Sequence, residues 1–66
     1  MSQTEKLQLH QGLKNFGLNP AEWILVRLNR LHFAIFAKSN PDLVFAGPVQ
    51  KLERGWDWVH LEFVEV

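Results

Sequence analysis

The chain has 66 residues, no cysteine, and seven basic residues that balance seven acidic ones. The length fits one domain with a small core, so we expect residues 1–66 to fold as a single unit. The absence of cysteine excludes disulfides, thiolate nucleophiles and Cys-ligated zinc, and the zero net charge disfavours nonspecific nucleic-acid binding, which needs a positive field.

The amino-terminal residues are polar and no apolar run follows them, which is not the pattern of a signal peptide. The longest apolar runs, such as residues 33–37, are far too short to cross a bilayer. These features predict a cytoplasmic protein without membrane contact.

The first element is predicted to be a helix over residues 4–16. Leu9, Leu13 and Phe16 fall within a narrow arc at 100° per residue, which gives one apolar stripe. Residues 6–10 also alternate with a period of two, so a strand is the alternative for that stretch.

The end of this helix is the best-specified local feature. Gly17 stands where a left-handed residue is wanted, and Leu18 follows where a Schellman motif places an apolar residue against Leu13. Gly12 weakens the helix by about 1 kcal/mol relative to alanine. We therefore expect Gly12 to approach the sheet closely, and the alternative is a helix that is simply weak.

After Pro20 the pattern changes to β-rich segments separated by turns. Residues 19–22 could cap a further helix, but the residues that follow are poor helix formers, so we predict a strand, with Asn29-Arg30 as the next turn. Gly47-Pro48 must end the third strand, bulge it or place it at an edge. The final strand is long enough to pair with more than one neighbour or to bend. The predicted strands are 23–28, 31–38, 43–50 and 56–66.

The predicted fold class is α+β, with the N-terminal helix packed on a three- to four-stranded antiparallel meander sheet. The alternative is a small SH3-like β-barrel with an N-terminal helix. Because successive side chains of a strand point to opposite faces, each strand can be sorted into two rows. In the last strand Val59, Leu61 and Phe63 form the row predicted for the core.

A single short helix covers only one face of a sheet, so the other face needs a partner. The rows place tryptophans with arginine and histidine on that second face, a composition typical of interface cores. In the barrel alternative the tryptophans would lie in a second core or along the rim of the barrel. The predicted binding face consists of Trp23, Arg27, His32, Phe36, Trp56, Trp58 and His60.

From this face we predict a non-catalytic protein-interaction or small-subunit module, with a homodimer as the simplest assembly. The alternative function is binding of single-stranded nucleic acid by stacking bases on the sheet aromatics.

The histidines are candidates for metal binding or for acid–base catalysis. His32, His60 and Glu62 include zinc-binding residue types but no paired spacing such as H-x-x-x-H, and no hydroxyl or thiol nucleophile lies near His60 in the sequence. We therefore expect no catalytic residues, no metal site and no cofactor, and the chain is predicted not to be an enzyme.

Overall fold

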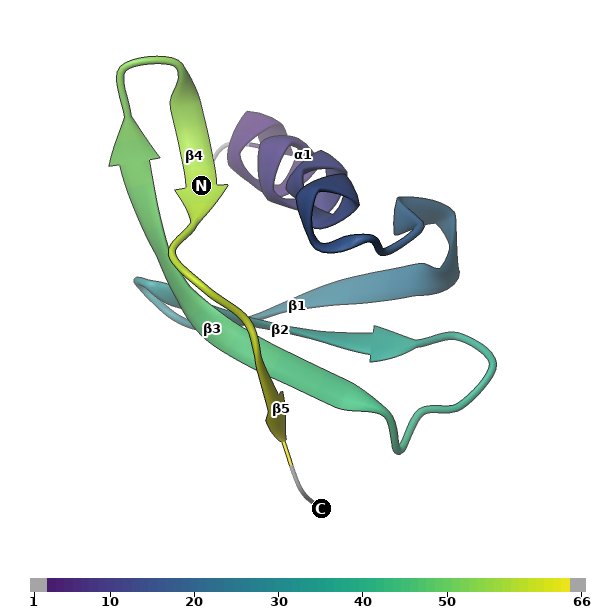
Figure 1. Ribbon diagram of the computed structural model, residues 1–66. Coiled ribbons are helices and arrows are strands. Elements are labelled where there is room, and N and C mark those ends of the chain that lie inside the picture. Colours follow the sequence, from purple (N-terminus) through teal and green to yellow (C-terminus); the bar gives the residue numbers. More distant parts are fainter. Residues whose placement is uncertain (1–2, 65–66) are drawn as a thin grey trace.

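The chain folds as α+β, with one N-terminal helix laid on an antiparallel sheet that does not close into a barrel (Figure 1). The computed structural model describes residues 3–64. Helix α1 spans Gln3–Gly12 and tightens into a 3₁₀ turn over Leu13–Phe16. The strands are β1 (Trp23–Asn29), β2 (His32–Ala37), β3 (Val44–Leu52), β4 (Gly55–Trp58) and β5 (Glu62–Val64).

The helix ends as the sequence predicts. Gly17 has a φ of 78°, and the Leu18 N–H donates to the Leu13 carbonyl at 3.2 Å, which is the long hydrogen bond of a Schellman motif. The Gly17 N–H donates to the Lys14 carbonyl at 3.0 Å. The strand alternative for residues 6–10 is wrong, because they lie within α1.

The segment before β1 combines the two structures that the sequence allowed. Asn19 accepts a hydrogen bond from the Ala21 N–H at 3.1 Å and caps a 3₁₀ turn over Pro20–Glu22, but this turn stops after three residues. Trp23 then starts β1, as predicted. The hairpin turn after β1 lies at residues 30–31, one residue later than predicted.

Strand β3 is central, so the expectation that Gly47-Pro48 would end it or place it at an edge is wrong, but the pairing is irregular there, because the register slips by one residue between Ala46↔Glu62 and Val49↔Trp58. Strand β3 pairs with β2 along one edge and with both β4 and β5 along the other. The Pro48 carbonyl accepts from the Val59 N–H at 3.0 Å. The backbone N–H and C=O groups of successive strand residues point alternately to the two neighbouring strands. Those of position 48 point toward residues 59–61, so the missing N–H of Pro48 falls where the pairing of β3 with β4 and β5 is already broken.

The predicted final strand does bend, but it does not reach a second neighbour. Its two parts, β4 and β5, both pair with β3, and residues 59–61 cross between them. Glycine is required at position 47, where residues 59–61 pass close to β3, because a Cβ there would overlap the carbonyl oxygen of His60. Glu65 and Val66, the end of the predicted strand, lie outside the described residues.

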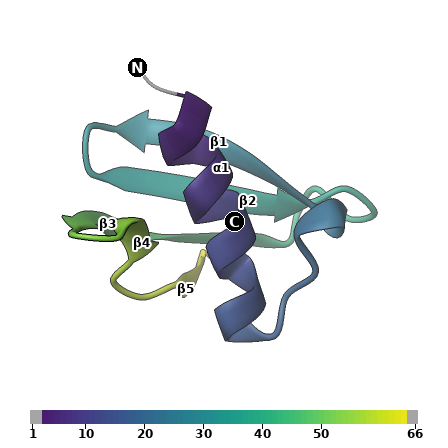
Figure 2. The same cartoon turned by 90° about the horizontal axis from the view of Figure 1, so that it is seen from above.

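The core lies between α1 and the sheet, where the helix crosses the strands (Figure 2). Leu9 and Leu13 of the predicted stripe are fully buried, whereas Phe16 is 42% exposed. The Trp58 indole N–H donates to the Leu9 carbonyl at 2.7 Å, which satisfies a carbonyl near the end of α1. The buried apolar cluster consists of Leu9, Leu13, Trp23, Phe33, Ile35, Ala37, Val49 and Trp58.

Gly12 lies against β4, as expected, and the contact leaves room for a methyl group. A Cβ at Gly12 would be 3.4 Å from Trp58 Cδ1 and 3.6 Å from Asp57 Oδ1. Gly12 already has right-handed helical dihedrals. We therefore expect Gly12→Ala to raise the free energy of unfolding by about 0.5 to 1 kcal/mol, which urea denaturation would measure. A loss of stability would mean that the contact with Trp58 is tighter than this geometry indicates.

Candidate functional site

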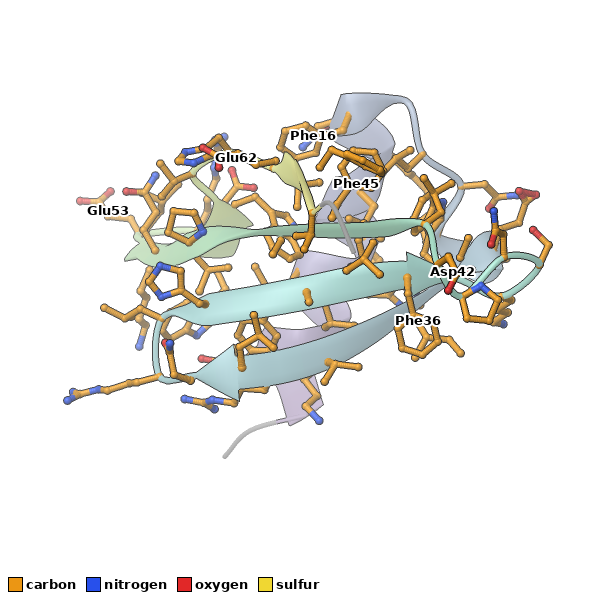
Figure 3. The ribbon with its side chains drawn as sticks, turned by 90° about the horizontal axis from the view of Figure 1, so that it is seen from below. Phe16, Phe36, Asp42, Phe45, Glu53 and Glu62 are labelled. Atoms are coloured by element: carbon orange, nitrogen blue, oxygen red, sulfur yellow. The ribbon has the colours of Figure 1, made fainter. Side chains whose placement is uncertain are left out.

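The face of the sheet opposite α1 is not covered by any described element. Figure 3 looks onto it, with the helix behind the sheet. Its residues alternate along each strand with those of the buried cluster, and the strand registers align them across the sheet except at Leu28, where the β1–β2 register shifts. This open face consists of Ile24, Val26, Leu28, His32, Ala34, Phe36, Val44, Ala46, Pro48, Glu62 and Val64. Within this set Ala34 is only 8% exposed.

The open face is apolar apart from two positions. Every residue of the set except His32 and Glu62 has an apolar side chain. On β1, Ile24 is 38% and Leu28 is 57% exposed, which is far more than core residues of the same types. Monomeric proteins rarely leave a continuous apolar sheet face in water, so this surface is the candidate functional site.

The residues of the predicted binding face do not lie together in the structure, and the tryptophans are not on the open face. Trp23 and Trp58 are only 8% and 4% exposed and belong to the core beneath α1. Trp56 is partly buried and packs against the same core. The assignment of these three indoles to the uncovered face is therefore wrong, because the helix lies on the side of the sheet from which they project.

Arg27 also lies on the helix side. Its guanidinium is 3.4 Å from the Glu5 carboxylate, and its Cζ atom lies 5.7 Å from the centre of the Phe33 ring. Its Nε and Nη2 atoms donate to the carbonyls of Asn29 and Arg30. Arg27 thus holds the buried Glu5 and the β1–β2 turn, and it does not flank the open face.

Only His32 and Phe36 of the predicted set lie together on the open face, two residues apart on β2. His60 lies in the exposed segment between β4 and β5, with its Nε2 atom 3.1 Å from Glu62 Oε1. The core row predicted for this segment is also wrong in part, because Val59 is 50% and Phe63 is 58% exposed. Phe63 contacts the core side through an edge-to-face contact with Phe45, at 5.6 Å between ring centres.

The sequence reasoning missed the aliphatic side chains of the open face. Ile24, Val26 and Leu28 form one row of β1, opposite the row of Trp23 and Arg27, and it is this row that is exposed. One signal could have found them. Glu5 is spaced by four residues from Leu9 and so lies on the buried side of α1, where it needs a cation, and Arg27 is in the row opposite to these three.

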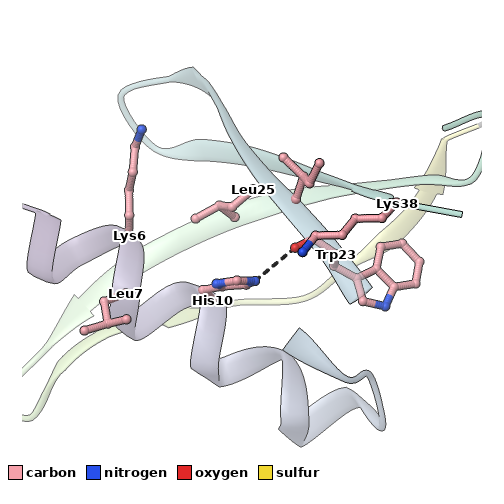
Figure 4. Close-up of a pocket in the computed structure, with 7 residues that line it drawn as sticks. Lys6, Leu7, His10, Trp23, Leu25 and Lys38 are labelled. Atoms are coloured by element: carbon pink, nitrogen blue, oxygen red, sulfur yellow. Dashed lines mark hydrogen bonds between the residues drawn. The ribbon is translucent and has the colours of Figure 1, made fainter. Parts of the chain in front are cut away.

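A shallow hollow of about 420 Å³ lies where α1 meets β1 (Figure 4). Lys6 and Lys38 line it together with apolar side chains. The His10 ring nitrogen at its base lies 2.6 Å from the Pro20 carbonyl and 3.0 Å from the Trp23 carbonyl. His10 therefore ties the helix to the start of β1, and this bonding accounts for its position.

A second hollow of about 410 Å³, between α1 and β4, is lined mainly by polar side chains such as Gln8, Asn15 and Arg54. Neither hollow is lined by a serine or threonine hydroxyl. Within residues 3–64, no three histidine or acidic side chains come together in a way that could hold a metal ion. The two hollows therefore offer less than the open face as the basis of a functional assignment.

No helix within the described part of the chain combines the length and apolar character needed to span a membrane. Comparison of the chain with family models, with curated proteins and with solved structures gave no match. The functional assignment therefore depends on the open face itself.

Proposed function

We propose that this chain is a non-catalytic interaction module, and that its open face binds the same face of a second copy. The observation that supports this proposal is the uncovered aliphatic surface formed by β1, β2, β3 and β5. The single helix shelters only one face of the sheet, and the other face carries mainly aliphatic side chains and Phe36, with no tryptophan.

The size of the open face suits a small dimer. The strands β1, β2 and β3 have six to nine residues and β5 has three, so the face is roughly 20 Å across and 20 Å along its longer strands, and a partner would remove on the order of 500 Å² from water on each protomer. Twice this area is close to the lower end of specific interfaces, which is about 1,000 Å² in total. We therefore expect a reversible dimer with a dissociation constant in the micromolar range.

Charge also favours a second copy over a charged partner. Glu62 is the only residue of the open face with a full charge, and it lies on β5 at the edge of the sheet. The chain has zero formal net charge, so two copies meet without long-range repulsion. No lysine or arginine of the open face is available to bind phosphates.

The nucleic-acid alternative gains no support from this arrangement. Base stacking needs exposed aromatic rings beside cationic side chains. Trp23 and Trp58 are buried, and the aromatic side chain of the open face, Phe36, is surrounded by aliphatic residues.

The test measures the molar mass of the protein in solution, and then asks whether one charge added to the open face weakens the dimer. Sedimentation equilibrium between about 1 µM and about 200 µM is expected to show a monomer–dimer equilibrium. Val26→Lys places an ammonium group on the open face, at a position that is 39% exposed in the protomer. We expect this variant to weaken the dimer at least tenfold, because the charge would be buried without a partner.

The matched control is Gln11→Lys, which adds the same charge at an exposed position on α1. Its dissociation constant should equal that of the unchanged protein within a factor of about two. An unchanged protein that stays monomeric up to about 200 µM would rule out the proposal. Equal dimerisation by the two lysine variants would exclude the open face as the interface.

A further inference from the structure

The open face carries a pattern of large and small side chains that runs across the strands. The strand registers place Ile24, Phe36, Val44 and Val64 side by side, and we call this set the bulky row. The next positions along the same strands form the small row, which consists of Val26, Ala34, Ala46 and Glu62. The two rows lie about 7 Å apart, since alternate residues of a strand share a face.

We infer that two copies pack face to face about a two-fold axis that runs parallel to these rows and midway between them. This inference rests on the proposed function and specifies its geometry. Rotation about such an axis places the bulky row of each protomer on the small row of the other. The large side chains of the central strands then meet alanines, with Phe36 on the partner's Ala34 and Val44 on the partner's Ala46.

This arrangement satisfies both packing and charge. Facing layers of side chains pack densely when large residues oppose small ones, and two aligned sheets lie about 10 Å apart. The central pairs come from β2 and β3, which are the middle strands of the face, so the twist between the sheets disturbs them least. Glu62 on β5 opposes the partner's Val64 at the rim, where its carboxylate stays in water.

The competing two-fold axis runs along the strands and gives a poorer fit. It would place Phe36 opposite the partner's Val44, and Ala34 opposite the partner's Ala46. Large side chains would then hold the sheets apart while the alanines left a void between them. The two axes predict different responses to a change in size at Ala34.

The experiment exchanges the sizes of two facing positions. Ala34→Phe is expected to weaken the dimer at least tenfold, because two large rings would oppose each other. Phe36→Ala is expected to weaken it about tenfold, because the bulky row loses its largest member. The double variant A34F/F36A restores one large and one small side chain at each facing pair. Its dissociation constant should return to within about threefold of the unchanged protein.

Two results would overturn the inferred geometry. One is a dimer that A34F leaves equally strong or strengthens, as expected for the axis along the strands. The other is a double variant that is as weak as the product of its two single changes. In either case the proposed function stands if Val26→Lys still dissociates the dimer, whereas a monomeric unchanged protein removes both proposals.

Circular dichroism would reveal a variant that fails to fold. In that case the geometry can still be tested on the unchanged protein. An isotope-filtered NMR experiment on a mixture of labelled and unlabelled chains detects contacts between protomers only. Cross-peaks between the Phe36 ring and the partner's Ala34 methyl group are the expected result. Cross-peaks from Phe36 to the partner's Val44 in their place would support the competing axis and refute ours.

Discussion

Replacing Trp58 with phenylalanine is expected to lower the free energy of unfolding by about 2 to 3 kcal/mol. The substitution leaves the Leu9 carbonyl without the indole N–H that donates to it at 2.7 Å, and it removes volume from a site that is only 4% exposed. The edge-to-face contact with Phe33, at 6.3 Å between ring centres, also changes. A domain of this size is stabilised by only about 3 to 5 kcal/mol, so most of its stability would be lost.

Trp56→Phe is the matched control, because it makes the same chemical change two residues away in a partly buried position. We expect it to cost less than about 1 kcal/mol. Urea denaturation followed by circular dichroism measures both variants. Equal midpoints for the two variants would show that the Trp58 indole hydrogen bond contributes nothing specific.

Replacing Gly47 with alanine is expected to cost about 3 kcal/mol or more. The new methyl group would overlap the His60 carbonyl oxygen, and it would lie 3.0 Å from the His60 carbonyl carbon and 3.3 Å from the Leu61 Cα. These are backbone atoms, so the crossing segment has to move away from β3 as a unit. Movement of this segment would also break the hydrogen bond from the Val59 N–H to Pro48.

Gly12→Ala makes the same substitution where a methyl group is accommodated, so the pair of glycine variants separates a steric effect from a general effect of the added methyl group. Thermal unfolding of both proteins gives the comparison. G47A should melt well below the unchanged protein and G12A slightly above it. A G47A protein of full stability would contradict the close crossing of residues 59–61 over β3.

Local features of the fold could be predicted from the sequence, because a few neighbouring residues determine them. The helix end is confirmed at Gly17, which is left-handed, and Leu18 lies at Leu13 as predicted, where its N–H donates to the Leu13 carbonyl. The strand that starts at Trp23 was also correct, because its residues are poor helix formers. The passage of β3 through Pro48 could not be predicted, since it depends on a break in a partner segment that begins eleven residues further along the chain, at Val59.

The choice of the covered face was the decisive error at the candidate site. Both rows of β1 are rich in apolar residues, so periodicity sorts the side chains without telling which row meets the helix. Arg27 lies in the same row of β1 as Trp23, and an arginine in a row is typical of a solvent-exposed face. In the structure Arg27 lies beside the buried Glu5, so the charge that suggested exposure is instead satisfied under the helix. Acidic and basic residues on facing elements therefore needed to be considered together.

The hydrogen bond between Trp58 and Leu9 joins residues 49 positions apart, and it has a consequence for biosynthesis. The ribosome makes α1 well before β4, the strand on which the helix docks. A ten-residue helix has little stability in water by itself, so α1 must wait as a fluctuating segment until β4 has been made. A nascent chain halted before Trp58 would therefore lack the docked helix, although every residue of that helix had already been translated.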